Sequence, residues 1–242
     1  MANNSLAVRL GRHLRLSAAE QAAVAALQDQ ERFYRRGTVV ISENAPSREL
    51  FVVQSGWLHS SLYLGNGSRQ IMRLHFSSDI LGLPLLAFEE SPESVTAVTD
   101  VTLSPFSRER LASFFAEHPR LAALTLALSV ADRVALADRL ASIGRTSARA
   151  RVASLLCEII HRQELTGNSC EALHLPLTQE EMGDATGLTA VHVNRMMRKL
   201  AEEGIIERSG NTIRFKDRQR LCEEASFSNR TPNTADWLPG PR

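Results

Sequence analysis

The stretch that decides the fold runs from Leu177 to Ile206 and reads LTQEEMGDATGLTAVHVNRMMRKLAEEGII. Thr178 is placed to N-cap a first helix, and Glu181 completes a capping box three residues later. Gly187 ends that helix and supplies a tight turn. Thr189 is placed to N-cap a second helix. These signals, in this order, predict a helix-turn-helix.

The second helix of this stretch is amphipathic. The apolar positions that we expect to face the core recur at helical spacing: Val193, Met196, Met197 and Leu200. The opposite face carries three basic residues and no acid, as a helix that meets phosphates and base edges requires. The residues expected at DNA are Thr178, Gln179, Thr189, Ala190, Val191, His192, Asn194, Arg195, Arg198 and Lys199. On this stretch alone, a surface hairpin with one cationic side remains the alternative.

Length and composition set the outer bounds. The chain has 242 residues, 43% of them hydrophobic, which suffices for one large or two ordinary domains with a real core. We expect no membrane-spanning segment and no signal peptide, because no apolar run is long enough and the N-terminus is not apolar. Three scattered cysteines, Cys157, Cys170 and Cys222, argue against a disulfide framework and favour the reducing cytoplasm.

The N-terminal half changes from helical to alternating periodicity. Ser17 and Glu20 form a second capping box, which opens a short helix to about Gln30. Strands are then expected at 38–42, 49–54, 56–64, 69–76, 94–99 and 101–106. Short strands joined by tight turns predict an antiparallel barrel or jelly roll, called the β-roll below. The same alternation predicts that His59 and His75 occupy ordinary surface positions.

A long helix is expected after the β-roll, beginning near Pro119 and running to about Ile143. It carries a narrow heptad-like stripe, which consists of Leu121, Leu124, Leu128, Ala131 and Ala135. The stripe either packs on the chain's own β-roll or pairs with the same helix of a second subunit. Because helix-turn-helix proteins commonly bind two-fold symmetric sites, we predict that it forms a homodimer interface.

The C-terminal half supplies the rest of the organisation. Gly144 is expected to break the long helix and act as a hinge, and 207–215 reads as a hairpin, the wing of a winged helix. The fold class is therefore α+β. The expected segments are a sensor or effector β-roll at 1–118, a dimerisation helix at 119–143, a winged helix-turn-helix at 144–220 and a disordered tail at 221–242.

This order of segments resembles the Crp/Fnr family of bacterial transcription regulators, over roughly Ser17 to Arg220. The stretches that carry the resemblance are GWL at 56–58, DILGLP at 79–84, GRTSARARVASLL at 144–156, PLTQEEM at 176–182 and GLTAVHVNR at 187–195. The resemblance implies a homodimeric, cytoplasmic regulator. Its cyclic-nucleotide-binding-like β-roll would hold or sense an effector, and its C-terminal domain would bind palindromic double-stranded DNA and contact RNA polymerase.

The effector pocket departs from the family pattern. Members that bind cyclic AMP carry a Gly-Glu-Leu segment, but Leu83 stands at the position of that Glu. They also carry an Arg that holds the phosphate, and here Glu93 occupies its position. The pocket candidates that the resemblance implies are Gly82, Leu83, Glu93, Ser94, Leu136 and Ala137, the last two at the place of the pair that meets adenine. We therefore do not expect cyclic AMP to be the effector.

Other sensing chemistries have little support in the sequence. The oxygen sensors of the family keep an N-terminal cysteine cluster, whereas no cysteine precedes Cys157 here. We interpret Cys157 as a small core hydrophobe, because it lies among Leu155, Leu156 and Ile159. The alternative function is a ligand- or redox-responsive β-roll protein, sensing haem, cysteine oxidation or another small molecule, with the same DNA-binding output.

Enzymes form the main rival class. The sequence has no P-loop, no GxSxG, no HExxH and no CxxC pair, so we expect no catalytic residue, no metal and no cofactor. A β-roll that serves as the regulatory subunit of a larger assembly would leave the cationic helix and the wing unexplained.

The DNA-reading helix keeps one family residue and loses another. Arg195 is kept and can donate two hydrogen bonds to guanine O6 and N7. Val191 replaces a Glu of several members and could contact a thymine methyl group. Asn194 could pair with adenine, and His192 could bind a base or a phosphate. We expect four further residues to contact the DNA backbone and position the helix rather than read bases: Gln179, Glu180, Arg198 and Lys199.

Overall fold

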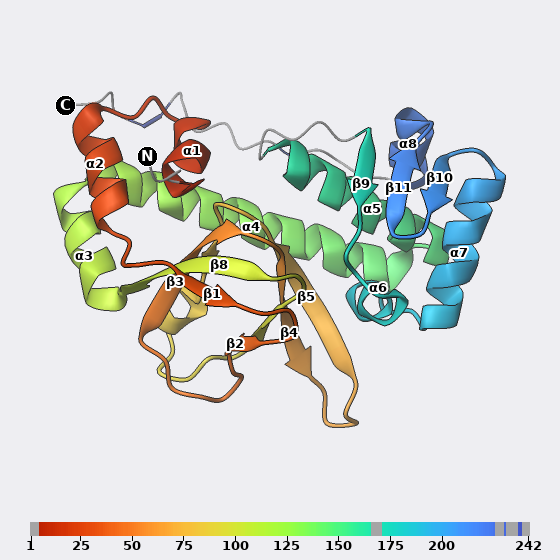
Figure 1. The fold of residues 1–242 in the computed structure, drawn as a ribbon, viewed down its shortest axis with the longest axis horizontal. Coiled ribbons are helices and arrows are strands. Elements are labelled where there is room, and N and C mark those ends of the chain that lie inside the picture. The colour runs from red at the N-terminus through yellow and green to blue at the C-terminus, as the bar shows by residue number, and fades with distance from the viewer. Residues whose placement is uncertain (1–4, 166–170, 226–229, 231–236, 239–242) are drawn as a thin grey trace. The chain divides into compact units, whose positions relative to one another are not determined.

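The computed structural model describes residues 5–165, 171–225, 230 and 237–238 (Figure 1). The chain folds into two compact units. Of the described residues, the N-terminal unit comprises 5–62, 74–134, 230 and 237–238, and the C-terminal unit comprises 63–73, 135–165 and 171–225. The architecture is α+β, as the sequence predicts.

The β-roll consists of two four-stranded antiparallel sheets. The strands of the first sheet, in order, are β1 (Arg32–Tyr34), β8 (Val101–Ser107), β3 (Glu49–Ser55) and β6 (Ile80–Leu81). Those of the second are β2 (Val39–Ile41), β7 (Ser94–Ala97), β4 (Leu58–Tyr63) and β5 (Arg69–His75). All six strands expected from the alternation are confirmed. The additional strands β1 and β6 are too short to show a period.

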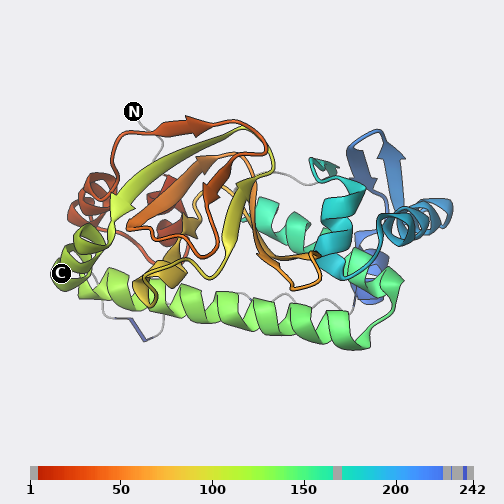
Figure 2. The ribbon, with the colours of Figure 1, turned by 90° about the horizontal axis from the view of Figure 1, so that it is seen from below.

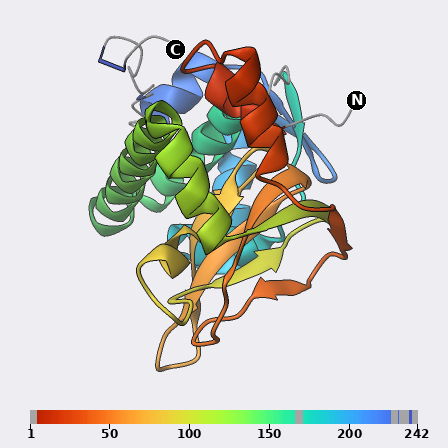
Figure 3. The same ribbon diagram turned by 90° about the vertical axis from the view of Figure 1, so that its left-hand side faces the viewer.

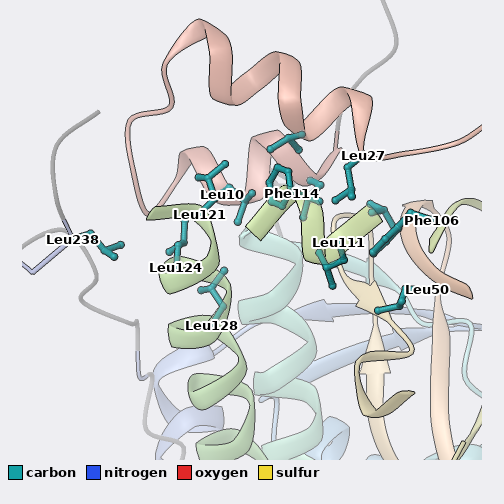
Figure 4. Close-up of a cluster of buried hydrophobic side chains, with 13 residues drawn as sticks. Leu10, Leu27, Leu50, Phe106, Leu111, Phe114, Leu121, Leu124, Leu128 and Leu238 are labelled. Atoms are coloured by element: carbon teal, nitrogen blue, oxygen red, sulfur yellow. The ribbon is translucent and has the colours of Figure 1, made fainter. Parts of the chain in front are cut away.

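Strand β3 shows how the β-roll is packed. Phe51 and Val53 belong to a hydrophobic cluster to which strands of both sheets contribute, so this cluster lies between the sheets. Leu50 and Val52 alternate with them and belong to a second cluster, which the helices complete (Figure 4). Both faces of β3 are therefore buried, and the first sheet is the middle layer of the unit.

Three helices gather at one end of the β-roll (Figures 1 and 3). They are α1 (Ser5–Gly11), α2 (Ala18–Ala26) and α3 (Arg108–Glu117). The predicted capping box of α2 is confirmed, because the Ser17 and Glu20 side chains bond each other's backbone N–H groups. Glu20 also accepts a hydrogen bond of 3.0 Å from Arg120 in a buried ion pair. Helix α1 had no signal in the sequence analysis.

Helix α4 (Pro119–Arg145) is one unbroken helix (Figure 2). The predicted break at Gly144 is misplaced by about two residues, because the helix continues through this residue and ends at Arg145. A glycine inside a helix costs only about 1 kcal/mol relative to alanine, which a long helix tolerates. The turn comes at Thr146, and Ser147 then N-caps the next helix by accepting a hydrogen bond from Ala150 N.

The predicted dimer stripe of α4 is also wrong for its leucines. Leu121 and Leu124 are 0% exposed and Leu128 is 9% exposed, and all three belong to the second hydrophobic cluster (Figure 4). The first half of α4 therefore packs on the chain's own β-roll, which was the other interpretation of the stripe. Ala131 is half-buried and Ala135 is exposed.

Two histidines of the β-roll correct a further expectation. His59 and His75 are 1% and 6% exposed, so the prediction of surface positions is wrong. His75 Nε2 lies 3.2 Å from the Ser60 hydroxyl, which is also buried. Because β4 is buried on both faces from Leu58 to Ser61, the alternation of its residues does not mark a solvent side.

Besides the end of α4 and most of β5, the described part of the C-terminal unit contains four helices and a small sheet. The helices are α5 (Ala148–Glu164), α6 (Gln179–Thr186), α7 (Ala190–Glu202) and α8 (Arg218–Ala225). The sheet has the strand order β10 (Ile206–Ser209), β11 (Thr212–Phe215) and β9 (Ala172–His174). The predicted start of the tail at 221 is wrong, because Leu221 is a fully buried residue of α8. The tail lies largely outside the described residues.

Candidate nucleic-acid interface

Helix α6 begins and ends where the sequence predicts. The Thr178 hydroxyl accepts a hydrogen bond of 3.1 Å from Glu181 N, and Thr178 N donates one of 2.7 Å to the Glu181 carboxylate. Gly187 ends the helix with a φ of 66°, in the left-handed region that glycine favours. The capping box and the stop signal are both confirmed.

The turn after α6 depends on a second glycine, Gly183, which was not expected to matter for the turn. A Cβ atom on Gly183 would lie 2.5 Å from the Leu188 carbonyl oxygen, closer than such atoms can approach. The Leu188 N–H group donates a hydrogen bond of 3.0 Å to the Gly183 carbonyl. Gly183 therefore lets the chain fold back closely onto α6. A glycine four residues before the stop glycine was the available signal.

Helix α7 follows this turn and presents two different faces. Thr189 N-caps it by accepting a hydrogen bond of 3.3 Å from His192 N. The buried face is the predicted one and consists of Val193, Met196, Met197 and Leu200. On the other face Val191 is 77% exposed, and the Arg198 side chain is 72% exposed.

The predicted DNA-facing residues gather on α6, its cap and the outer face of α7. Those that are exposed are Thr178, Thr189, Val191, His192, Asn194, Arg195, Arg198 and Lys199. Gln179 and Ala190 are partly buried. From Ala190 to Ala201 the helix has no acidic residue, and its first acid is Glu202, which pairs with Arg198 at 3.5 Å. From Ala190 to Ala201 the exposed face is therefore cationic and apolar, without a carboxylate to repel phosphate.

An ion-pair cluster anchors the C-terminal end of α7. Glu203, its C-cap residue, pairs with Arg149 of α5 and with Arg220 of α8. Arg149 also donates hydrogen bonds of 2.9 Å to Glu224 of α8. The hydrogen bond from Arg149 lowers the pKa of the Glu203 carboxyl group. This cluster joins α5, α7 and α8, and the sequence offered no pattern that predicts it.

The predicted wing is confirmed as the hairpin β10–β11. Gly210 lies in its turn with a φ of 57°. Arg208 and Arg214 are exposed on its strands, whereas Lys216, just after β11, pairs with Glu207 at 2.8 Å. Strand β9 pairs with β11 as a third strand that was not expected.

The effector-pocket candidates of the N-terminal unit lie around Ile41. Gly82 has a φ of 82°, and a Cβ atom added to it would lie 3.4 Å from Ile41 Cδ1. Ile41 in turn is opposite Val95 of β7. Ser94 precedes Val95, and its hydroxyl accepts a hydrogen bond of 3.1 Å from Glu43 N. The two segments therefore approach each other, as the predicted pocket requires.

The chemistry of these segments is unlike that of an anion site. Gly82 leads directly into a 3-10 helix, η1 (Leu83–Leu86), in which Pro84 offers no N–H group. The carbonyl of Glu93 accepts a hydrogen bond of 2.6 Å from Ser91 Oγ, and its side chain brings a negative charge. The remaining candidates, Leu136 and Ala137, are exposed on α4 and belong to the C-terminal unit.

Within the described residues, no group of three or more His, Cys, Asp or Glu side chains is arranged to hold a metal ion. No helix in the described part of the chain combines the length and the apolarity needed to span a bilayer.

Comparisons with known proteins match both units. Residues 150–224 match the Crp-like helix-turn-helix domain, and residues 31–118 match the cyclic nucleotide-binding domain. The chain is 30% identical over 199 residues to the transcriptional activator protein FnrL of Cereibacter sphaeroides, covering 80% of this chain and 79% of that protein. It is 28% identical over 213 residues to the CRP-like cAMP-activated global transcriptional regulator of Mycobacterium tuberculosis, covering 85% and 93%.

Among solved structures, FixK2 from Bradyrhizobium japonicum is similar to this chain with a TM-score of 0.75 and 26% identity. The match covers 83% of this chain and 98% of FixK2. The β-roll, the long helix and the winged helix-turn-helix thus recur together in this relative.

Proposed function

The chain belongs to the Crp/Fnr family of DNA-binding transcriptional regulators, and we propose that it binds a palindromic promoter site as a homodimer without cyclic AMP. The observation that carries this proposal is the outer face of α7, which is exposed, basic and free of carboxylates as far as Ala201. Because its target is DNA, the proposed site of action is the cytoplasm. RNA polymerase is the proposed protein partner, as the family relationship implies.

The proposed reading of the half-site follows from the position of each side chain on α7. Arg195 is exposed on the outer face and reads guanine through two hydrogen bonds. Asn194 and Val191 contact adenine and a thymine methyl group. Arg198 and Lys199 lie one turn further along and hold phosphates, which sets the register of the helix without reading bases. In the dimer, two such helices meet successive major grooves about 34 Å apart.

The proposed dimer forms through a different face of α4 from the one that the leucine stripe suggested. Leu126, Val130 and Leu140 are 66%, 46% and 73% exposed. Together with Arg133 and Ala137 they recur at alternating intervals of four and three residues, which is the spacing of a coiled-coil seam. The seam is apolar at every position except Arg133, and the same helix of a second copy offers a matching surface.

Independence from cyclic AMP is supported by the residues around Ile41. A cyclic nucleotide brings a phosphodiester charge, and Glu93 places a carboxylate where a cation would be needed. Ser94 already accepts a hydrogen bond from Glu43 N. Pro84 removes one backbone donor from the segment after Gly82. The residues present therefore do not fit a cyclic nucleotide, and the proposed β-roll responds to another signal or to none.

The test is a gel-shift selection of promoter fragments with the reduced, unliganded chain. A selected palindrome should bind the unliganded dimer, and Arg195→Ala should cost about 1–3 kcal/mol per half-site and relax preference at one base pair. Arg198→Ala should weaken all sequences alike and reduce the salt dependence of binding. Arg35→Ala, an equal loss of charge at an exposed position of the N-terminal unit, is the matched control.

Two outcomes would overturn the assignment. Equal loss of specific and random DNA binding in Arg195→Ala would contradict its role in reading bases. Failure of the unliganded chain to select any palindrome, with binding restored by a small molecule, would instead favour the ligand-responsive alternative.

A further inference from the structure

Two of the three cysteines meet inside the C-terminal unit. The Sγ atoms of Cys157 on α5 and Cys222 on α8 lie 3.6 Å apart, although 65 residues separate them in the sequence. Both are free thiols, and α5 packs against α8. A disulfide bond is about 2.05 Å long, so these sulfur atoms are in contact but not bonded.

The environments of the two thiols differ. Cys157 is only 2% exposed, whereas Cys222 is exposed to solvent. Burial raises the pKa of Cys157, the charge of neighbouring Cys222 raises it further, and the charge of Arg218 partly offsets both. The proton therefore stays on the buried sulfur. Cys222, which is exposed to solvent, is the sulfur that a dissolved reagent can reach.

We propose that Cys157 and Cys222 are a redox pair, which a hydroperoxide converts into an intrachain disulfide between α5 and α8. If Cys157 served only as a small hydrophobic residue of the core, its sulfur would need no contact with the exposed thiol of Cys222. Exposed Cys222 contributes little to the core, and its sulfur is nevertheless held against that of Cys157.

The chemistry takes two balanced steps. The Cys222 thiolate attacks the outer oxygen of the hydroperoxide, the O–O bond breaks, and the alcohol or water leaves after gaining a proton. Cys222 is then a sulfenic acid. The Cys157 sulfur attacks the Cys222 sulfur, an S–S bond forms, and the S–O bond breaks. The departing hydroxide takes the Cys157 proton and leaves as water, and a reduced dithiol reverses the result.

The disulfide would cross-link α5 and α8 and would leave the DNA-binding surface of α7 unchanged. To form the bond, the two sulfurs must approach from 3.6 Å to about 2.05 Å. The bond would join the two helices whose Arg149 and Arg220 already hold Glu203 at the end of α7. It therefore reinforces an existing arrangement. The outer face of α7 carries neither cysteine and stays open.

The experiment compares oxidised and reduced full-length chains that carry Cys170→Ser, because Cys170 lies outside the described residues and could pair on its own. After treatment with hydrogen peroxide, each chain should lose two hydrogen atoms in its intact mass. Peptide mapping should join the peptides of Cys157 and Cys222. The melting temperature of the C-terminal unit should rise by at least about 5 °C, because the bond closes a long loop. Dithiothreitol should reverse both changes.

Cys222→Ser and Cys157→Ala are the control variants, and the alanine avoids placing a hydroxyl group in the core. Neither should form the crosslink or gain stability on oxidation. The dissociation constant for the selected palindrome should change less than about threefold between oxidised and reduced chains, a difference of about 0.65 kcal/mol.

Three results would overturn the proposal. They are oxidised chains joined to one another through Cys222, a Cys222 sulfinic acid with Cys157 still a free thiol, and a change of more than tenfold in DNA affinity on oxidation. Because the mass and mapping measurements need no DNA, failure of the redox pair and failure of the proposed DNA-binding function remain distinguishable.

Discussion

The close approach at Gly183 makes the substitution Gly183→Ala a sharp test of the helix-turn-helix geometry. The added methyl carbon would lie 2.5 Å from the Leu188 carbonyl oxygen. This oxygen belongs to the backbone of the turn, so no side-chain rotation can relieve the contact. The turn must move away from α6, and Thr189, the N-cap of α7, lies in the part that moves.

The magnitude follows from two opposing effects. Overpacking of a well-packed site costs about 1–3 kcal/mol, and a clash with backbone belongs at the upper end of that range. Alanine also favours the helical conformation of α6 by about 1 kcal/mol relative to glycine. The net destabilisation of the C-terminal unit is therefore about 2 kcal/mol. For a unit of this size, its melting temperature should fall by roughly 8–16 °C.

The assay is thermal unfolding followed by a DNA gel shift, with Gly144→Ala as the matched control. Gly144 is also helical, but nothing lies within 4 Å of a Cβ atom built on it. The same chemical change should there be neutral or stabilise the protein by up to about 1 kcal/mol. Gly183→Ala should also bind the palindrome more weakly than the control does. A melting temperature of Gly183→Ala equal to or above that of the parent chain would refute the reasoning.

Three other predictions follow from the same structure. The pKa of Glu203 is lowered in the folded state, so its ion pairs stabilise the fold at neutral pH and this stabilisation is lost as the pH falls through the lowered pKa. Glu203→Gln should therefore reduce the fall of the melting temperature over this acidic range, measured by thermal unfolding at a series of pH values. The double variant Leu126→Asp and Leu140→Asp should sediment as a monomer at micromolar concentration, whereas Ala135→Asp, on the opposite side of α4, should remain a dimer. Calorimetry with millimolar cyclic AMP should show no saturable binding, because the Glu93 carboxylate opposes the phosphate; micromolar binding would contradict the proposed pocket.

Local signals in the sequence predict helix starts and one helix end well. The cap residues Ser17, Thr178 and Thr189 begin their helices as expected, and Gly187 ends one. Each of these signals acts over three or four residues through a hydrogen bond to the nearby backbone, so tertiary packing has little power to override it. The buried and exposed faces of α7 follow for a similar reason, since helical periodicity alone separates them.

Features that depend on distant residues escaped prediction. Cys157 and Cys222 meet only because α5 and α8 pack together, and nothing in their spacing shows it. The cluster of Arg149, Glu203 and Glu224 likewise joins three helices that are far apart in the chain. The alternation around His59 predicts a surface position only for a sheet with one side exposed to solvent, and β4 is buried on both sides there.

Helix α4 shows why one helix can support two interpretations at once. Its leucines at 121, 124 and 128 recur at the spacing of a buried stripe, and they pack in the hydrophobic core of the chain's own N-terminal unit. A second series begins at Leu126 and continues through Leu140, at coiled-coil spacing and exposed. Periodicity identifies both series but cannot say which one faces the chain's own β-roll. The burial of the first series settles that question. The second series is therefore the part of α4 that remains available to a second copy of the chain.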